Sequence, residues 1–550
     1  MKEYLRSKIL EALGRSNLAA ASPIVFEKPK TESHGDLSTN FALLAAKELR
    51  MKPRELAERI VDLLEIDSSI LEQPQVAGPG FINFKFSDKY YLSSIKEVFE
   101  KGVEYGKSST GGGKKTQVEF VSANPTGPLT VGHGRNAVFG DTVANLLQWT
   151  GHEVTREYYF NNAGRQMRVL GDSVRLRYKE IIGDPIDFPE DHYQGGYIRD
   201  IAQHIYDDRG GSLVDEPAEG LFKERAEKDI FEDIKQTLLR LGIKFDVYFN
   251  ENSLYETGKI KEVIGALETA GLTYDKEGAK WFKATAVGGD QDKVIVKSTG
   301  EPTYRLPDIA YHIEKFRRGF ELVIDIFGAD HIATYPDVLL ALKSLGYDTG
   351  RVKVLIHQFV TVLQNGEVVK MSTRKANFIT LDELTDWVGV DAVRFFFLMR
   401  SIGTHLNFDV DLAKKQSEEN PVFYLQYAYA RIASIIRFAD SEGINVDGLL
   451  VNGKSNFDVS LLKEKEEIEL AKKLGGFPES VEAAAATFEP HRIINYLQEV
   501  AETFHRFYHV HRVVIPDRGL AEARLALCAA AKTVLSNGFM ILGISAPEKM

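Results

Sequence analysis

The sequence predicts an α/β core built on a parallel sheet, preceded by an N-terminal α+β domain and followed by a C-terminal all-α helical bundle. Three observations support this fold class. Strand, loop, helix and strand patterns follow one another over residues 117–160, which is the repeating unit of a parallel α/β sheet. A stretch rich in serine, glycine and lysine precedes them at 108–115 and is typical of a linker. Beyond Thr380 the pattern is helical almost to the end.

Length and composition indicate a soluble multidomain chain. At roughly 150 residues per domain, 550 residues correspond to three or four domains. No apolar run approaches the ~18 residues that a membrane span needs, and the N-terminus has no apolar signal core. The single cysteine, Cys528, excludes a disulfide framework and a multi-cysteine zinc site. We therefore expect a cytoplasmic protein with no membrane partner.

The charge balance leaves the partner open. The formal net charge is −11, from 68 Lys and Arg against 79 Asp and Glu. A nucleic acid responds to the local field of one face rather than to the total charge. Composition alone therefore neither supports nor excludes a nucleic-acid partner.

Residues 1–110 are expected to form the N-terminal domain. Early helical patterning leads into a polar loop over 28–36, and a helical stretch follows over 40–64. Residues 77–86 alternate after a glycine-proline turn and predict a strand. The linker at 108–115 places the boundary near residue 110.

Residues 111–410 are expected to form the core, and 411–550 the helical bundle. Strands are predicted at 117–121 and 153–160 with a helix between them over 132–149, and the helix-rich range 165–290 is interpreted as an insertion. Further buried strands are expected at 293–297 and 322–327. Two β-prone arms over 352–370 flank Asn365-Gly366, a strong hairpin signal. Thr380 and Glu383 have the spacing of a capping box.

The first segment with chemical potential is Pro125–Asn136, between a predicted strand and a predicted helix. A helix N-terminus offers unpaired N–H groups and a positive dipole end, which suit a phosphate. Gly127, Gly132 and Gly134 lack side chains, so a base or phosphate can approach the backbone there. His133 can donate to phosphate oxygens. The alternative is a strand-to-helix turn with an incidental histidine.

The second segment is Val369-Lys370-Met371-Ser372-Thr373-Arg374-Lys375, on the exit of the predicted hairpin. Its three cations suit a triphosphate whose charge moves during reaction. The alternative is a solvated basic turn. Each segment is ambiguous alone, but both lie beside the same predicted core.

Together the two segments resemble the signature motifs of class I aminoacyl-tRNA synthetases, His-x-Gly-His and Lys-Met-Ser-Lys-Ser. Here they are Thr130-Val131-Gly132-His133 and Lys370-Met371-Ser372-Thr373-Arg374. Within that class the chain is similar to arginyl-tRNA synthetases along nearly its whole length, with supporting segments at 118–125, 302–312 and 420–431. The resemblance implies a Rossmann-type catalytic core. Residues 547–550 resemble the family's usual ending, so a complete chain is expected.

The resemblance implies ATP-dependent attachment of L-arginine to tRNA(Arg) through an arginyl-adenylate, with Mg²⁺ assisting. Its catalytic residues would be His133, Thr130, Lys370 and Arg374. Its ATP-binding residues would be Gly132, His133, Asn136, Lys370, Met371 and Ser372. Thr130 and Thr373 depart from the family pattern, because they replace the first histidine of one motif and the second lysine of the other. No resident metal site is expected.

Arginine selection requires acidic groups, because a guanidinium is matched by carboxylates in fork geometry and by a flat aromatic face. Tyr304 and Asp308 are four residues apart and share a face if that segment is helical. The resemblance places Tyr304, Asp308 and Glu251 at the guanidinium. It places Glu119, Ser122 and Asn124 at the amine and carboxylate of the amino acid. The alternative is that Tyr304 packs in the core and the acids are surface charges.

The helical bundle has features of an RNA-binding surface. Tyr424, Tyr427 and Arg431 lie on one predicted helix, and stacking on unpaired bases is a common mode of RNA recognition. Ordinary helix packing is the alternative. The resemblance implies that the bundle binds the anticodon, that residues 1–110 contact the tRNA elbow and that the protein is a monomer. A different class I synthetase and a non-catalytic RNA-binding paralogue are the competing functions.

Overall fold

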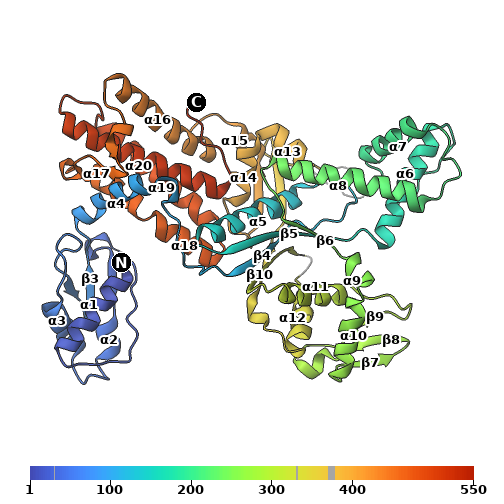
Figure 1. The fold of residues 1–550 in the computed structure, drawn as a ribbon, viewed down its shortest axis with the longest axis horizontal. Helices are drawn as coiled ribbons and strands as arrows, with labels where there is room; N and C mark the ends of the chain where they lie inside the picture. Colours follow the sequence, from blue (N-terminus) through green and yellow to red (C-terminus); the bar gives the residue numbers. More distant parts are fainter. Residues whose placement is uncertain (30, 330–331, 370–377) are drawn as a thin grey trace.

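The computed structural model describes residues 1–29, 31–329, 332–369 and 378–550. The described chain has a central sheet, a helical bundle on one side, a helical arm on the other and a small N-terminal domain that hangs from the bundle (Figure 1). The predicted fold class is confirmed. The signature loop 370–374 lies outside the described residues.

The central sheet has five parallel strands in the order β11-β10-β4-β5-β6. The strands are β4 (Lys115–Glu119), β5 (Glu153–Phe160), β6 (Val247–Asn250), β10 (Leu322–Gly328) and β11 (Val352–His357). The helix α5 (Val131–Trp149) connects β4 to β5. The strands predicted at 117–121, 153–160 and 322–327, and the helix between the first two, are therefore confirmed.

Three sequence predictions are corrected in detail. The strand predicted at 293–297 is β9 (Lys293–Val296), which joins β7 (Thr273–Lys276) and β8 (Ala279–Phe282) in a separate antiparallel sheet. The first arm predicted over 352–370 is β11 of the main sheet instead of a hairpin arm. Finally, β6 lies within 165–290, so the structure divides the range that we interpreted as one insertion.

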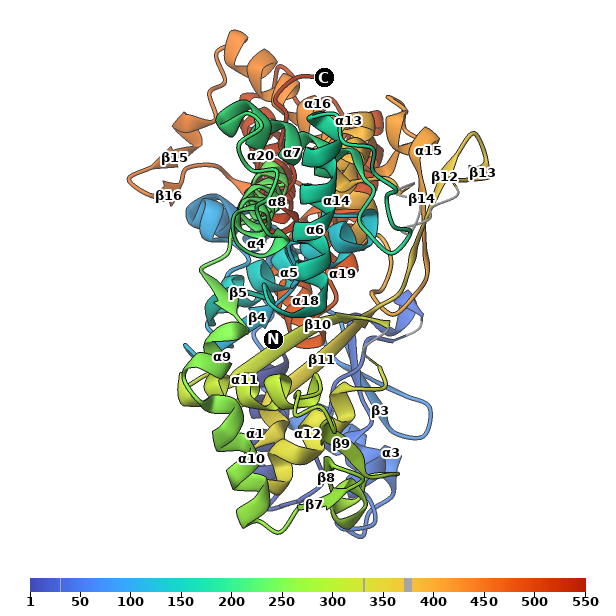
Figure 2. The same ribbon diagram turned by 90° about the vertical axis from the view of Figure 1, so that its right-hand side faces the viewer.

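The part of that range before β6 is a helical arm. Its helices are α6 (Gly164–Ile181), α7 (Gly196–Arg209) and α8 (Lys223–Arg240). After β6, α9 (Asn252–Glu256) and α10 (Lys259–Thr269) pack with α11 (Arg305–Arg317) and α12 (Tyr335–Ser344) below the sheet, as Figures 1 and 2 show.

The Asn365-Gly366 hairpin is confirmed, with arms β12 (Val360–Gln364) and β13 (Glu367–Val368). The φ angles of Asn365 and Gly366 are 53° and 74°, the left-handed values that a two-residue turn of this kind requires. On its other side β12 pairs in parallel with β14 (Leu406–Asp409). The capping box at Thr380 and Glu383 is also confirmed, at the start of α13 (Leu381–Val388).

The C-terminal helices form the expected bundle. They follow α14 (Val390–Leu398) and α15 (Val410–Lys414), and they are α16 (Pro421–Ser441), α17 (Lys465–Gly475), α18 (Phe477–Thr487), α19 (His491–Val510) and α20 (Arg518–Leu542). Within the described residues, α20 alone is long and apolar enough to cross a membrane, a feature that our search for apolar runs missed. Because 78% of its apolar window is buried inside the protein, α20 is the core helix of the bundle.

The small N-terminal domain combines α1 (Lys2–Arg15), α2 (Phe41–Ala45) and α3 (Pro53–Leu63) with a three-stranded sheet. The strands of that sheet are β1 (Leu37–Thr39), β2 (Gln75–Ala77) and β3 (Phe81–Phe84). We assigned α4 (Asp88–Lys101) to this domain from the sequence, but it packs on α17 and α20 instead. The Ser94 hydroxyl donates to the Ala471 carbonyl at 3.1 Å, which ties α4 to the bundle.

The bundle is joined to the core by a buried arginine. Arg394 on α14 donates from Nε to the Leu542 carbonyl at 2.9 Å, from Nη1 to the Leu241 carbonyl at 2.8 Å, and from Nη2 to Asp141 on α5 at 2.6 Å. Gly543 ends α20 with φ of 68°, and a Cβ there would meet the Arg394 guanidinium at 2.2 Å. The last turn of α20 is therefore fixed against α5.

The packing of α5 on the sheet depends on Gly140. A Cβ at this position would lie 2.3 Å from Cγ of Phe120, close to the backbone of that residue, so the ring cannot swing away cheaply. We predict that Gly140→Ala lowers the free energy of unfolding by at least about 1–3 kcal/mol through overpacking. Scanning calorimetry will show this as a lower Tm.

Gly265→Ala is the matched control. Gly265 lies in α10 with nothing within 4 Å of an added Cβ, so the substitution gains helix propensity of about 0.5–1 kcal/mol. A Tm for Gly140→Ala equal to or above that of Gly265→Ala would contradict the packing assigned to α5.

Candidate active site

The predicted site residues gather at the carboxyl edge of the central sheet. The chain runs from β4 to β5 and β6 on one side, and β10 and β11 lie on the other side. The strand order therefore reverses between β4 and β10, and ligands of open α/β sheets bind at such a switch point. Glu119 ends β4 and Glu251 directly follows β6, so both carboxylates reach this edge.

The chain bends sharply after β4. Val121 and Ser122 have φ angles of 64° and 45°, and a positive φ is costly for a β-branched residue such as Val121. Oδ1 of Asn136 accepts the Val121 N–H at 2.7 Å, and its Nδ2 donates to the Ile326 carbonyl at 2.9 Å. Asn136 was predicted to bind ATP, but the structure shows it buried and holding this bend to β10.

The first turn of α5 fixes His133. The N–H of Thr130, the N-cap residue, lies 3.1 Å from Nδ1 of His133 and donates to it. The Thr130 hydroxyl lies 3.3 Å from the same nitrogen. Because Nδ1 accepts, the imidazole carries its proton on Nε2. The threonine that departs from the family motif therefore orients the histidine that follows it.

The three glycines of the first motif have different neighbours. A Cβ on Gly132 would meet only the Thr130 hydroxyl, at 3.7 Å, so this position is open to a ligand. A Cβ on Gly127 would lie 2.9 Å from the Tyr197 hydroxyl, and one on Gly134 would lie 2.5 Å from Leu381. Close protein packing therefore explains Gly127 and Gly134, which we had interpreted as room for a base or phosphate.

A continuous hydrogen-bond network joins four predicted arginine-binding residues. Ser122 donates to Glu119 at 3.1 Å and accepts the Tyr159 N–H at 3.2 Å. The Tyr159 hydroxyl donates to Glu251 at 2.8 Å. Asn161 continues the network, because its side chain donates to Glu251 at 2.8 Å and its N–H donates to Asn124 at 3.0 Å.

The fifth residue, Asp308, joins the network through its backbone carbonyl, and its carboxyl group lies within electrostatic range of the same charges. Lys315 has no exposed surface, and its ammonium donates to Glu119 and Asp325 at 2.6 Å each. His312 contacts Asp325 through Nε2 at 2.9 Å and the Asp308 carbonyl through Nδ1 at 2.7 Å. Because a carbonyl only accepts, Nδ1 of His312 donates to Asp308, and Lys315 and His312 lower the pKa of Asp325.

The carboxyl groups facing the pocket have raised pKa values. Burial raises the pKa of Glu251, and it raises the pKa of Asp308 to about 7, with the Glu119 and Glu251 charges adding to the effect on Asp308. The Glu119 and Glu251 charges therefore act on Asp308 from nearby, although His312 and Lys315 partly offset their effect on its pKa. Such a site gains most from a cationic ligand.

Tyr304 lies outside this hydrogen-bond network. It is 81% exposed at the N-terminus of α11, one turn before Asp308. The rings beside the acids are Tyr159, Tyr255 and Tyr311, which the sequence analysis missed together with Asn161, His312, Lys315 and Asp325. Asp308, His312 and Lys315 follow an i, i+4, i+7 pattern, so the sequence did contain a signal for part of the set.

The second signature segment contributes no observed geometry. Lys370, Met371, Ser372 and Arg374 lie outside the described residues, so their roles stay predictions. Across the described ranges no group of three or more His, Cys, Asp or Glu side chains could hold a metal ion.

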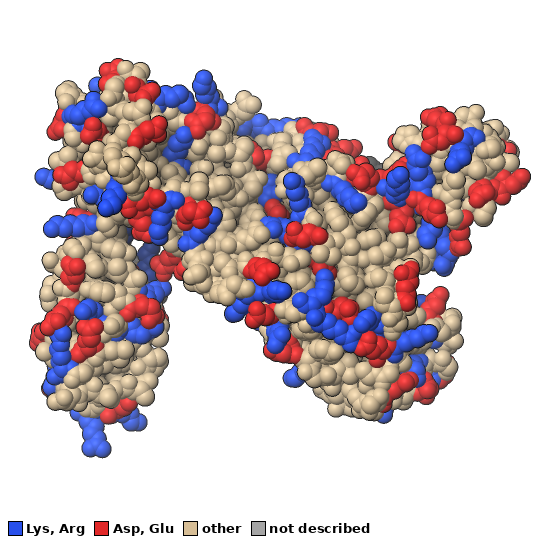
Figure 3. All heavy atoms as spheres, in the orientation of Figure 1, with Lys and Arg blue, Asp and Glu red and all other residues tan. Residues whose placement is uncertain are grey.

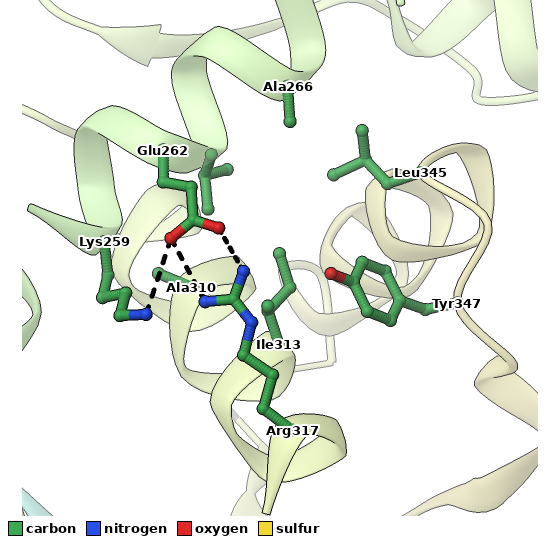
Figure 4. Close-up of a pocket in the computed structure, with 9 residues that line it drawn as sticks. Lys259, Glu262, Ala266, Ala310, Ile313, Arg317, Leu345 and Tyr347 are labelled. Atoms are coloured by element: carbon green, nitrogen blue, oxygen red, sulfur yellow. Dashed lines mark hydrogen bonds and ion pairs between the residues drawn. The ribbon is translucent and has the colours of Figure 1, made fainter.

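A separate hollow lies between α10, α11 and the segment that follows α12 (Figure 4). Lys259 and Arg317 both pair with Glu262 at its rim, over an apolar wall that includes Val263 and Ile313. Its cavity volume of about 90 Å³ is far below the ~300–1,000 Å³ of ligand pockets. It is therefore not a substrate site.

The predicted tRNA-binding residues lie together on the bundle. Tyr424 and Tyr427 have ring centroids 5.2 and 6.0 Å from that of His505 on α19. Arg431 donates to the Tyr427 hydroxyl at 3.3 Å and lies 5.1 Å from the Tyr508 ring centre. Aromatic and basic groups from two helices thus share one surface, which the sequence placed on one helix only.

Surface charge does not single out a nucleic-acid face in the view of Figure 3. Blue and red side chains are interspersed over the N-terminal domain, the bundle and the arm. This mixture agrees with the net charge of −11.

Comparison with known proteins identifies the family. The description "tRNA synthetases class I (R), catalytic domain" matches residues 94–394, "Arginyl tRNA synthetase N terminal domain" matches 3–86 and "DALR anticodon binding domain" matches 425–550. The arginine–tRNA ligase of Chlorobium phaeovibrioides is 51% identical, and that of Salinibacter ruber 49% identical, each over the full length of both chains. The chain belongs to the arginyl-tRNA synthetase family.

A solved member of the arginyl-tRNA synthetase family shares the fold. The arginyl-tRNA synthetase of Thermus thermophilus superposes with a TM-score of 0.76 over 100% of both chains, at 22% identity. The match of the family's N-terminal description ends at residue 86, just before α4, in agreement with the packing of α4 on the bundle.

The buried ammonium of Lys315 offers a stability test. In Lys315→Met the carboxylates of Glu119 and Asp325 lose their shared cation. We therefore predict that the free energy of unfolding falls by about 3–5 kcal/mol. Without the cation both carboxyl pKa values rise in the folded state. The stability of the variant should therefore increase as pH falls from 8 to 5, as a pH series of calorimetric scans will measure.

Lys259→Met is the control, since this lysine pairs with Glu262 and Glu314 at the protein surface. Loss of the Lys259 ammonium should lower the free energy of unfolding by no more than about 1 kcal/mol. In the wild-type protein the lowered pKa of Asp325 gives stability that is lost only as pH falls below the normal range of Asp, whereas the raised pKa of Glu119 gives a gain in acid that the variant should exceed. Equal losses in both methionine variants would contradict the role of Lys315.

Proposed function

We propose that the protein ligates L-arginine to tRNA(Arg) in an ATP-dependent reaction through an arginyl-adenylate, releasing AMP and pyrophosphate. The observation that carries this proposal is that Glu119 and Glu251 share one hydrogen-bond network at the switch point, beside the first turn of α5, with the Asp308 carboxyl group close enough to interact with both charges. An acidic pocket next to a phosphate-binding helix end suits a cationic amino acid that reacts with ATP.

Arginine would lie with its guanidinium toward Asp308 and Glu251. These two carboxyl groups have raised pKa values, so a guanidinium that restores their charge gains more than it would at the surface. Glu119, Ser122 and Asn124 would hold the amine and carboxylate, because they end the same network nearer to α5. Tyr159, Tyr255 and Tyr311 replace Tyr304 as the aromatic lining.

In the first step the arginine carboxylate would attack the α-phosphate of ATP. His133 carries its proton on Nε2 and would donate to the phosphate, and the positive end of α5 adds to that stabilisation. Gly132 leaves room for the adenosine. Lys370 and Arg374 would hold the β- and γ-phosphates, with Met371 and Ser372 beside the nucleotide.

Mg²⁺ would travel with the nucleotide. It is commonly held by substrate phosphates and only one or two carboxylates, so a preformed protein cage is not required. Bound there, it would neutralise charge on the pyrophosphate that leaves.

In the second step the 2′- or 3′-hydroxyl of the terminal tRNA adenosine takes the arginyl group. The surface formed by Tyr424, Tyr427, Arg431, His505 and Tyr508 would stack on anticodon bases, since aromatic and guanidinium faces bind unpaired RNA bases. We further propose that the N-terminal domain contacts the tRNA elbow and that the enzyme is a cytoplasmic monomer.

Aminoacylation of total tRNA with each of the twenty radiolabelled amino acids, ATP and Mg²⁺ tests the function. We predict that arginine alone is charged and that His133→Ala lowers kcat while tRNA binding is retained. Binding of tRNA without charging of any amino acid would identify a non-catalytic relative instead.

Asp308→Asn tests the pocket. The variant loses a charged partner of the guanidinium, which costs about 1.5–3 kcal/mol, so the KM for arginine should rise roughly 10- to 150-fold. In the wild type a pKa of about 7 means that protonation competes with arginine, so its KM should rise about tenfold from pH 8 to pH 6. Steady-state kinetics across this range will measure both effects.

The asparagine variant should lose this pH dependence, and its KM for ATP should stay unchanged. It should also be more stable than the wild type at pH 8. The raised pKa of Asp308 means that wild-type stability falls as pH rises through about 7. A KM for arginine that stays unchanged in the variant would place Asp308 outside the pocket.

A further inference from the structure

We propose that Arg135 is a positioning residue that fixes the β12–β13 hairpin, which leads into the second signature segment, against the first turn of α5. The kinetic part of this inference rests on the proposed function. Its structural part does not.

Arg135 is completely buried and clamps backbone carbonyls instead of a carboxylate. Nη1 donates to the carbonyls of Gln358 and Thr404 at 2.9 Å each, and Nη2 donates to that of Ser401 at 3.1 Å. No described acid forms an ion pair with it, and Nε is buried without a hydrogen-bond partner among the described residues. Burial lowers the pKa of Arg135 to about 10. A buried charge without an acidic partner lowers the stability of the fold, so the three carbonyl contacts are the structural role that accounts for this arginine.

The three carbonyls belong to the base of one small sheet. Gln358 lies two residues before β12, and Ser401 and Thr404 lie just before β14, the parallel neighbour of β12. The Gln358 N–H also donates to the Ile402 carbonyl at 3.1 Å, which closes the base of the sheet. The guanidinium therefore holds both strands of this base to α5 at once.

Described residues on both sides of 370–377 are held near the N-terminus of α5, the first through the clamped hairpin and the second directly. Before the gap, the Val369 N–H donates to the Val362 carbonyl at 3.0 Å, within the hairpin that Arg135 anchors. After it, the Leu381 N–H donates to the Leu129 carbonyl at 2.8 Å, and Thr130 and Thr380 form an antiparallel bridge. Because Gly134 has no side chain, Leu381 can pack against the first turn of α5.

The consequence is a fixed relation between the first turn of α5 and the described end of the hairpin at Val369. His133 lies two residues before Arg135 in the same helix, and Lys370 directly follows Val369 in the sequence. The proposed action of Lys370 on the triphosphate would therefore depend on the clamp through Val369. Lysine cannot replace it, since a single ammonium lacks the fork that spans two segments.

Arg135→Lys tests the inference by two independent measurements. Hydrogen exchange monitored by mass spectrometry should show residues 360–369 exchanging at least tenfold faster than in the wild type, with β4 and β5 unchanged. Aminoacylation kinetics should show a KM for ATP raised about tenfold and a lower kcat, with the KM for arginine within twofold of wild type. Arg135→Gln, which keeps one donor group without the charge, serves as the second variant if the first does not fold.

Arg394→Lys is the matched control, because Arg394 is an equally buried arginine that packs against α5 through Asp141 and also holds backbone carbonyls. It should lower Tm but leave the exchange of 360–369 and the KM for ATP within twofold of wild type. Unchanged exchange of 360–369 in Arg135→Lys would overturn the inference, as would equal effects of both lysine variants. Failure of the wild type to charge arginine would overturn the proposed function, while the exchange result would still decide the role of Arg135.

Discussion

The ammonium of Lys315, placed between Glu119 and Asp325, is the interaction on which the proposed site depends. It links β4, β10 and α11 at the reversal point of the sheet, and it does so without exposed surface. With Lys315 in place Glu119 can face Ser122 and Asp325 can face His312, so both arms of the network have fixed positions. The remaining acids can then be left without a protein cation of their own. A cationic ligand would compensate the charge of these acids.

The site thus separates compensated charge from uncompensated charge. Asp325 is ionised and satisfied by the protein, whereas Asp308 and Glu251 have raised pKa values and are satisfied only in part. Asp325 therefore supports the structure, whereas Asp308 and Glu251 are the residues that we propose for ligand binding. The residues of helix α5 likewise differ in role, since Asn136 and Arg135 hold the backbone while Gly132 leaves open space beside it.

The sequence predicted three strands of the central sheet, the hairpin and the capping box, because each rests on local patterns such as Asn365-Gly366. Five of the six residues proposed from the sequence for arginine binding share one network, and their role in binding stays a prediction. The sequence analysis misplaced Tyr304 and misread Asn136, Gly127 and Gly134. The neighbours that decide their roles, among them Ile326 and Leu381, are distant in sequence, and periodicity carries no information about such contacts. Lys315 was missed for the same reason, since its partners come from β4 and β10.

The most direct test of the pocket is a crystal structure of the protein with L-arginine at pH 8. The account predicts the guanidinium within hydrogen-bond distance of Asp308 and Glu251, with the amine near Ser122 and Asn124 and the Lys315 contacts intact. A guanidinium bound elsewhere, with Asp308 and Glu251 turned toward protein groups, would contradict it.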